Sequence, residues 1–257
     1  MANTWVLVIN CGSSSIKLDV LDPATGERAK RGELTLSGKV ERVGKPGCQF
    51  TLGTQTQDLD GADHGAALGR VLPGFLEGIQ IAAVGHRVVH GGADFNSAVR
   101  IDESVQRKID ELSKLAPLHN PPNLAGIRAA MELLPSSAHV AVFDTAFHST
   151  LPTRAKEYAL PAKLREEHGI RRYGFHGPSH RWVASSAAAH LGSDMRDLRM
   201  ITCHLGNGAS VCAVEYGRSI DTSMGMTPLE GLVMGTRSGD VDAGVLLELL
   251  RQGKSVD

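Results

Sequence analysis

The sequence predicts an α/β protein built from two related lobes, and three observations support this fold class. Apolar runs of strand length alternate with amphipathic stretches of helix length along the 257 residues. Two hairpin patterns with glycine-containing polar tips, at 6–22 and 200–214, resemble each other although they lie far apart. The 29 glycines suit a fold with many tight turns. We therefore expect two lobes that each present a glycine-rich tip to a shared cleft.

The first hairpin pattern consists of a buried strand over 6–9, a polar turn over 10–15 and a second strand whose alternate residues are apolar. Its tip carries a glycine, three serines, an asparagine and a lysine, but no bulky side chain. Backbone N–H groups, hydroxyls and one cation at a glycine turn can form a cradle for phosphate oxygens. An ordinary serine-rich hairpin is the alternative for this stretch.

The rest of the first lobe shows patterns of period 2 and period 3.6 in turn. After short strands and turns over 23–65, we expect a helix over 66–76, a strand over 79–89, helices over 102–115 and 123–134, and a strand over 139–143. Asp144 follows that last strand, and the carboxyl ends of strands are where open α/β sheets place their chemistry. We place the domain boundary so that the lobes span 1–148 and 149–257.

The second lobe is expected to contain helices on both sides of its hairpin. The pattern predicts helices over 161–168 and 178–191, the hairpin over 200–214, a loop rich in Gly, Ser and Thr up to Asp240, and a helix over 241–250. The last helix has an apolar face with little obvious to cover it, formed by Val245, Leu246, Leu249 and Leu250.

Composition and charge exclude several function classes. The formal net charge of −1 favours neither nucleic acid nor an anionic membrane as a partner. No apolar run approaches the ~20 residues of a membrane span, and no signal-peptide pattern opens the chain. The four cysteines have no metal-ligand spacing and suit reduced thiols. We therefore expect a cytoplasmic protein without a nucleic-acid or membrane partner.

Seven motifs, in this order, resemble the acetate kinase family. They are INCGSSSIK, GHRVVHGG, PLHNPPN, VFDTAFH, RRYGFHGPSH, HLGNGAS and DTSMGMTPLEGLVMGTRSGD. The resemblance runs from about residue 6 to the end of the chain, and it implies the two-lobed, actin-like ATPase (ribonuclease H-like) fold. Members of the family continue well past the position of Asp257. We therefore expect this sequence to be a fragment whose second lobe is incomplete.

The resemblance also implies an activity and its ligands. The activity is the reversible phosphorylation of acetate by ATP, giving acetyl phosphate and ADP by direct in-line transfer. The expected metal is Mg²⁺, with Mn²⁺ as an alternative, and the expected assembly is a homodimer when the chain is complete. The acceptor is acetate or another short-chain carboxylate, and a propionate-preferring relative stays open, because one methylene is worth only about 1–3 kcal/mol of discrimination.

Two arginines are candidates for the positive charge that phosphoryl transfer to a carboxylate requires. Arg87 ends an apolar strand near two glycines, and Arg237 lies in a glycine-flanked loop. A guanidinium binds a carboxylate or a phosphate in a two-pronged manner, although a surface ion pair is the alternative for each arginine. By resemblance, Arg87 holds the substrate carboxylate and Arg237 stabilises the transferring phosphoryl group. Both are expected to face solvent, so that alanine substitutions leave the fold intact.

His176 stands immediately before a predicted helix, where its ring and the helix N-terminus could face an anion together. Its spacing of four from His180 suggests metal binding as an alternative. However, Gly177 and Pro178 break the helical face that such a ligand pair needs, and HExxH is absent. By resemblance His176 stabilises the transition state, whereas His180 is expected to pack or to cap a helix.

Asp144 is the best acidic candidate in the sequence. Its possible roles are a base, or a group that orients the substrate and a metal-bound water; a turn carboxylate is the structural alternative. A carboxylate substrate is already ionised near neutral pH and needs no proton removed before attack. We therefore favour the orienting role for Asp144.

The two hairpin tips supply the candidate nucleotide-binding residues. By resemblance Asn10 binds Mg²⁺ and Lys17 binds nucleotide phosphates, with Ser13 and Ser15 at the same tip. Asn10 is a weak ligand alone, which suits an ion that keeps most of its waters. The second tip is expected to contact phosphates chiefly through backbone groups and the Asn207 side chain. Its candidate residues are His204, Leu205, Gly206, Asn207 and Gly208.

An apolar wall beside Arg87 would select a small acyl group. Val89 has the same strand parity as Arg87, and His119 is a plausible additional donor. Core packing is the alternative for the apolar candidates. Three further residues match the acetate pocket of the family, namely Leu118, Phe175 and Pro228.

Two other function classes stay open. One is a catalytically silent fragment that binds carboxylate or phosphate weakly, or that serves only as a structural or dimerising module. The other is a related ATPase or sugar kinase with the same fold, although the intact motif string between Arg87 and Arg237 argues against it. An assay for acetyl phosphate separates the kinase from the silent fragment.

Overall fold

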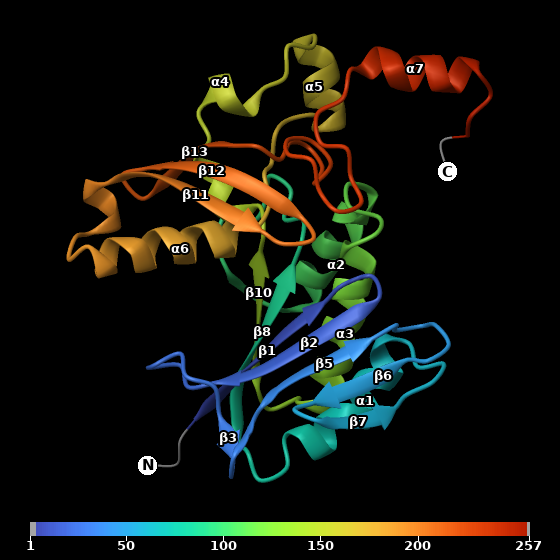
Figure 1. Ribbon diagram of the computed structural model, residues 1–257, viewed down its shortest axis with the longest axis vertical. Helices are drawn as coiled ribbons and strands as arrows, with labels where there is room; N and C mark the ends of the chain where they lie inside the picture. Colours follow the sequence, from blue (N-terminus) through green and yellow to red (C-terminus); the bar gives the residue numbers. More distant parts are fainter. Residues whose placement is uncertain (1–3, 256–257) are drawn as a thin grey trace. The chain divides into compact units, whose positions relative to one another are not determined.

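The structure is a computed structural model that describes residues 4–255. The chain divides into two compact units, Met1–Ala146 (unit 1) and Phe147–Asp257 (unit 2) (Figure 1). Within residues 4–255, no helix has both the length and the apolar character needed to cross a membrane.

Unit 1 contains an eight-stranded mixed sheet with the order β7-β6-β5-β2-β1-β8-β10-β9. The central strand β1 pairs antiparallel with β2 and parallel with β8, and β8 pairs parallel with β10. The strands are β1 (Trp5–Cys11), β2 (Ser15–Leu21), β5 (Ser37–Glu41), β6 (Gln49–Leu52), β7 (Gln55–Asp58), β8 (Ile81–Val88), β9 (Val99–Arg100) and β10 (Ala138–Phe143). A separate two-stranded sheet is formed by β3 (Lys30–Arg31) and β4 (Leu34–Thr35).

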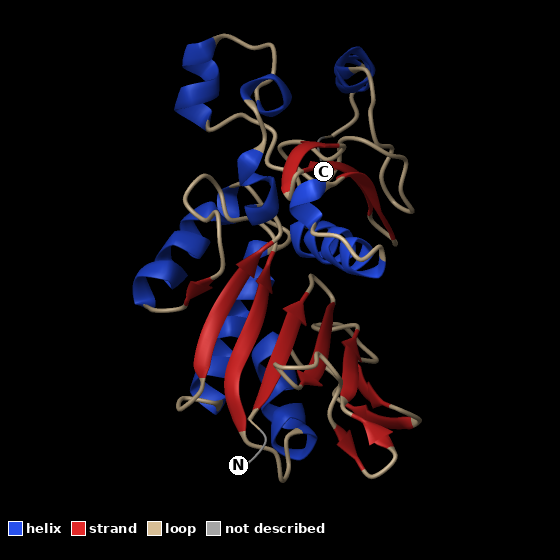
Figure 2. Cartoon of the chain, turned by 90° about the vertical axis from the view of Figure 1, so that its left-hand side faces the viewer, coloured by secondary structure: helices blue, strands red, loops and turns tan. Residues whose placement is uncertain are grey.

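Helices of unit 1 cover one face of this sheet (Figures 1 and 2). They are α1 (His64–Phe75), α2 (Glu103–Glu111), the short 3₁₀ helix η1 (Leu112–Lys114) and α3 (Asn120–Leu133). Because side chains alternate along a strand, Ile9 and Leu18 are buried in the core that includes the helices, whereas Asn10 and Lys17 lie on the opposite face. The polar residues of the first hairpin can therefore reach solvent while its apolar residues hold the sheet.

Unit 2 contains a three-stranded antiparallel sheet of β11 (Arg199–Leu205), β12 (Ala209–Glu215) and β13 (Arg218–Thr222). Ala184 of helix α6 (Gly177–His190) packs in one small core with Cys212 and Val214 of β12. The remaining elements are η2 (Ala146–Thr150), α4 (Thr153–Lys156), α5 (Ala162–His168), η3 (Met195–Asp197) and α7 (Ala243–Arg251).

Most elements agree with the sequence prediction, and the differences have local causes. Both hairpins are confirmed, and the apolar face predicted for α7 is exposed. Helix α3 begins at Asn120 rather than at 123, because its two prolines occupy the first turn, where a missing N–H costs nothing. The predicted helix over 102–115 ends as an α-helix at Glu111 and continues as a 3₁₀ turn. Neither β13 nor α4 was predicted, since both are short and polar.

Candidate active site

In unit 1, strand register gathers three predicted site residues on one face of the sheet. Asn10 lies directly opposite Lys17 in the antiparallel pair of β1 and β2. In the parallel pair of β1 and β8, Ile9 is matched with His86, so Asn10 and Arg87 are neighbours on the opposite face. Arg87 Nη1 donates to Asn10 Oδ1 over 3.2 Å. The strand ends therefore place a lysine, an amide and a guanidinium in one row.

Arg87 also binds Asp144 in a two-pronged manner. Its Nε donates to Oδ1 over 2.9 Å and its Nη2 donates to Oδ2 over 2.6 Å. Asp144 is only 1% exposed, so the guanidinium replaces water around the carboxylate. In turn, the Asp144 carboxylate raises the pKa of Arg87 above its ordinary value. Arg87 therefore faces solvent only in part, with 35% of its side chain exposed, because one of its edges holds a buried carboxylate.

Two residues that the sequence analysis did not select hold the first tip in place. His64 Nε2 lies 2.8 Å from the carbonyl oxygen of Gly12. The amide of Asn123 bridges two strand ends, because its Oδ1 accepts from Val89 N over 3.0 Å and its Nδ2 donates to Cys11 O. Asn123 is nearly fully buried on α3. A polar amide on the inward face of a helix was the signal that could have revealed it.

In unit 2, the second tip gathers His176, Arg237 and two glycines. A Cβ atom placed on Gly208 would lie 3.4 Å from Arg237 Nη1 and 3.5 Å from His176 Nε2. The absence of a side chain at Gly208 thus leaves a space that these two groups flank. A Cβ on Gly206 would likewise lie 3.5 Å from His204 Nε2.

Several contacts hold these groups around the second tip. The rings of His176 and His204 stack with a centroid separation of 4.0 Å. Arg237 Nη1 donates to the carbonyl oxygen of Pro228 over 2.9 Å, and Gly235 N donates to the carbonyl oxygen of Asn207 over 3.3 Å. A backbone hydrogen bond therefore ties the loop that carries Arg237 to the tip, and the Arg237 side chain is held by the carbonyl of Pro228 within the same loop.

The backbone of His176 adopts the left-handed conformation, with φ of 58°. This conformation is uncommon for a residue with a Cβ atom and is tolerated where the surroundings enforce it. His176 is the N-cap of α6, and Pro178 follows in the first turn. The conformation accompanies a 2.8 Å hydrogen bond between His176 Nδ1 and Ser210 Oγ on β12. His180 lies one turn further and is buried, which confirms the expectation that it packs.

The candidate acyl-binding residues differ in exposure. Leu118 is 71% exposed, and His119 is half-buried. Phe175 is 1% exposed, and its carbonyl oxygen lies 2.9 Å from His148 Nε2. Val89 is buried and Pro228 half-buried. The acyl-binding role of all five stays a prediction.

The residues around Asn10 fit a magnesium ion only if phosphates supply most of its ligands. Among residues 4–255, no group of three or more His, Cys, Asp or Glu side chains could hold a metal ion. Asn10 and Asp144 offer the oxygen ligands that Mg²⁺ prefers, but both accept hydrogen bonds from Arg87. This arrangement suits an ion that arrives on a nucleotide and keeps several waters, and not a metal cage built by the protein.

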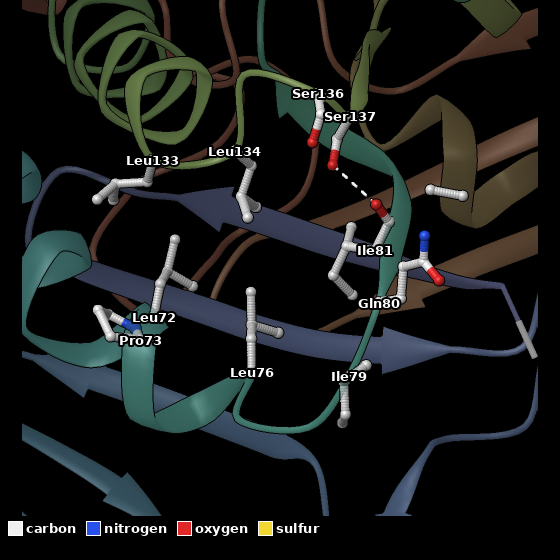
Figure 3. A pocket seen from close by; sticks show the side chains of 11 residues that line it. Leu72, Pro73, Leu76, Ile79, Gln80, Ile81, Leu133, Leu134, Ser136 and Ser137 are labelled. Atoms are coloured by element: carbon white, nitrogen blue, oxygen red, sulfur yellow. Dashed lines mark hydrogen bonds between the residues drawn. The ribbon is translucent and has the colours of Figure 1, made fainter.

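A pocket lined mainly by apolar residues lies elsewhere in unit 1. Its volume is about 550 Å³, and Figure 3 shows Leu72 of α1, Leu76 just after that helix, Leu133 of α3 and Ile81 of β8 among its lining. Ile81 begins β8, six residues before Arg87, which corresponds to about 20 Å along a strand. None of the residues described as lining it is charged, so this pocket is not the anion site.

Comparisons with known proteins extend these observations. The sequence pattern of the Acetokinase family matches residues 5–257. A curated acetate kinase from Clostridium botulinum (strain Kyoto / Type A2) is 49% identical in an alignment 266 residues in length, and this alignment covers 97% of this chain. The crystal structure of Porphyromonas gingivalis acetate kinase has a TM-score of 0.89 and 44% identity, and it covers 98% of this chain and 65% of its own. The crystal structure of a propionate kinase from Francisella tularensis subsp. tularensis SCHU S4 has a TM-score of 0.89 and 40% identity. The match covers 98% of this chain and 66% of the propionate kinase chain.

These likenesses confirm the predicted α/β, actin-like ATPase fold class. The chain spans 64% of the length of the Clostridium botulinum relative. The family pattern covers nearly all of the described residues, including both hairpins and both arginines. The chain belongs to the Acetokinase family.

Proposed function

We propose that this protein phosphorylates acetate with ATP, reversibly, and forms acetyl phosphate and ADP. A carboxylate oxygen of acetate attacks the γ-phosphorus, and the bond from that phosphorus to the ADP oxygen breaks in line with the attack. The observation that carries the proposal is the position of Arg237 Nη1 and His176 Nε2, which flank the same space above Gly208. Two nitrogen groups beside a glycine tip can stabilise the charge that develops on a transferring phosphoryl group.

Arg87 binds the acceptor carboxylate in this proposal. A guanidinium has five N–H groups, and Arg87 uses three of them for Asp144 and Asn10. These bonds leave one N–H on Nη1 and one on Nη2. The two N–H groups together can bind a second carboxylate at the outer end of the guanidinium. Asp144 holds the opposite edge. This arrangement supports an orienting role for Asp144, because its oxygens already accept from Arg87.

The two tips bind the nucleotide phosphates in this proposal. Lys17 supplies a cation on the same face as Asn10, and Ser13 and Ser15 supply hydroxyls at the first tip. The second tip contributes the backbone of 204–208 and the Asn207 side chain. Mg²⁺ or Mn²⁺, held on the phosphates with Asn10 as one ligand, would neutralise phosphate charge.

Further proposals rest on family membership. Val89, Leu118, His119, Phe175 and Pro228 would bound the acyl group. Propionate is a second candidate acceptor, since the chain is similar in sequence and structure to a propionate kinase. We also propose that the protein works in the cytoplasm as a homodimer.

A hydroxylamine-trapping assay for acyl phosphate tests the proposed function. The chain is incubated with Mg-ATP and with acetate, propionate, a hexose or no acceptor. Acyl phosphate formed from acetate supports the proposal, and a higher kcat/KM with propionate identifies the second acceptor. ATP binding without acyl phosphate would favour the silent alternative for this chain, and hexose-dependent ADP release would favour a sugar kinase.

A further inference from the structure

A line of hydrogen-bonded side chains runs from the proposed phosphoryl site into the core of unit 2. His176 Nδ1 lies 2.8 Å from Ser210 Oγ, and the same hydroxyl lies 2.8 Å from His180 Nε2. His180 Nδ1 in turn lies 2.8 Å from Thr202 Oγ1. Ser210, His180 and Thr202 are all nearly or fully buried. One serine hydroxyl therefore joins two imidazole rings.

The far end of this line fixes the direction of its hydrogen bonds. Thr202 has one hydroxyl hydrogen and donates it to the carbonyl oxygen of Cys212 over 3.4 Å. With its hydrogen used in this way, Thr202 Oγ1 is the acceptor of the 2.8 Å bond from His180, which assigns the hydrogen of the neutral His180 ring to Nδ1. In a neutral ring the other nitrogen, Nε2, is an acceptor, and it takes the hydroxyl hydrogen of Ser210.

The same reasoning reaches His176. Once the Ser210 hydroxyl donates to His180, its oxygen can only accept from His176, which requires a hydrogen on His176 Nδ1. His176 Nε2 is the nitrogen near the space above Gly208. In the neutral ring this nitrogen carries a lone pair, and it gains a hydrogen only when the ring is protonated.

We propose that Ser210 and His180 are positioning residues that hold neutral His176 in its Nδ1–H tautomer. His176 can then donate to a phosphoryl oxygen only as the imidazolium ion. The charged and titratable groups near its ring include Arg237 from the loop and His204 from β11, and His180 from α6 lies on the other side of the Ser210 hydroxyl. This inference about His176 as a donor rests on the proposed function, whereas the tautomer itself is a property of unit 2.

The tautomer can be measured without any enzyme activity. Histidine-labelled chain is examined by long-range ¹H–¹⁵N NMR at a pH where His176 is neutral, and His176 is assigned by its loss in His176→Asn. In the unsubstituted chain we expect a protonated Nδ1 and an unprotonated Nε2. Ser210→Ala should give a mixture of tautomers at His176. An Nε2–H tautomer in the unsubstituted chain, or unchanged nitrogen shifts in Ser210→Ala, would overturn the proposal.

Matched variants separate the hydrogen-bond line from a general packing effect. Thr202→Val keeps the shape of the side chain but removes the hydroxyl, and Thr202→Ser keeps the hydroxyl. We expect tautomer mixing in Thr202→Val and the unsubstituted pattern in Thr202→Ser. Ser179→Ala is a further control, because Ser179 binds His204 rather than His176. A mixture of His176 tautomers in Ser179→Ala, or equal effects of the two Thr202 variants, would contradict the proposal that this line of hydrogen bonds sets the tautomer.

Kinetics add a second readout where acyl phosphate formation is measurable. Ser210→Ala should lower kcat by about tenfold at the low-pH plateau, with the KM for acetate unchanged, because one oriented hydrogen bond is lost. The fall of kcat with rising pH should become shallower, since neutral His176 gains access to the Nε2–H form. Inactivity of the unsubstituted chain would count against the proposed function alone, because the NMR experiment still decides the tautomer.

Discussion

The two hairpins share one motif but are held in different ways. In unit 1, β1 lies between β2 and β8, and the residues around its tip include a guanidinium–carboxylate pair. In unit 2, β11 has only β12 beside it among the described strands, and Ile201 is 67% exposed. Imidazole rings and hydroxyls surround the second tip. The first tip thus has a guanidinium–carboxylate ion pair beside it, whereas the second has stacked imidazole rings and a guanidinium, Arg237, that bonds to a backbone carbonyl.

The comparison predicts that removing a charged group costs stability in unit 1 but not in unit 2. Arg87→Ala leaves the buried Asp144 carboxylate without its cation and should lower the free energy of unfolding by about 3–5 kcal/mol. Arg237→Ala leaves no buried partner charge among the described residues and should lower it by less than about 1 kcal/mol. Both should lower acyl phosphate formation by about 10²-fold or more. Urea unfolding measures the stability difference.

The double variant Arg87→Ala/Asp144→Ala is the control for this comparison. It removes the unpaired carboxylate, so it should be more stable than Arg87→Ala alone. Equal stability losses for Arg87→Ala and Arg237→Ala would break the distinction between the two units.

Asn123 offers the next largest effect, and it tests how unit 1 holds its strand ends. Asn123→Ala leaves the Cys11 carbonyl and the Val89 N–H without their partner, which should cost about 2–3 kcal/mol of unfolding free energy. Asn123→Asp keeps the acceptor, and its carboxyl can donate to the Cys11 carbonyl only when protonated, so the loss should be smaller at low pH than at high pH, where a buried charge faces that carbonyl. A change of less than 0.5 kcal/mol, roughly that of a neutral surface substitution, would show that the bridge is dispensable.

His86 lies on the helix-covered face of the unit 1 sheet, and it predicts how the stability of this unit depends on pH. Burial, and to a smaller extent the neighbouring His139 ring, lower the pKa of His86 to about 3; His86 Nε2 lies 3.0 Å from His139 Nδ1. As the pH falls below 6.5, the ordinary pKa of histidine, His86 binds a proton in the unfolded chain but stays neutral in the folded chain. The free energy of unfolding should therefore fall by about 1.4 kcal/mol per pH unit towards pH 3.

The control for this pH dependence is His86→Gln, which keeps hydrogen-bonding capacity but does not titrate. Its unfolding free energy, measured by urea titration at several pH values, should depend less steeply on pH between 6.5 and about 3. An equally steep fall in the variant would assign the effect to other groups.

The smallest expected stability effect is at the second tip. Gly208 has no positive φ, and its added Cβ would meet its neighbours at 3.4 Å or more, so Gly208→Ala should change the unfolding free energy by less than about 0.5 kcal/mol. It fills the proposed phosphate space, and the Kd for ATP in a calorimetric titration should rise about tenfold. Gly69→Ala is the matched control, since a Cβ there meets nothing within 4 Å. Unchanged ATP affinity in Gly208→Ala would remove the tip from the nucleotide site.

The sequence was sufficient for features that depend on local periodicity. Alternating apolar residues predicted both hairpins, and the apolar run before Asp144 placed that carboxylate at a strand end. Features that depend on distant partners were not accessible. Arg87 and Asp144 are 57 residues apart, and nothing in either motif shows that they pair. Ser210 was not selected from the sequence, because the two rings that it joins become neighbours only after α6 packs on the sheet.

The left-handed backbone at His176 has a consequence for how this site can change. Glycine adopts that conformation without penalty, so His176→Gly should relieve roughly 1 kcal/mol of backbone strain while it deletes the ring. The backbone at this position alone therefore favours glycine, whereas the hydrogen bond to Ser210, the stacking on His204 and the proposed role at the phosphoryl site all require the imidazole.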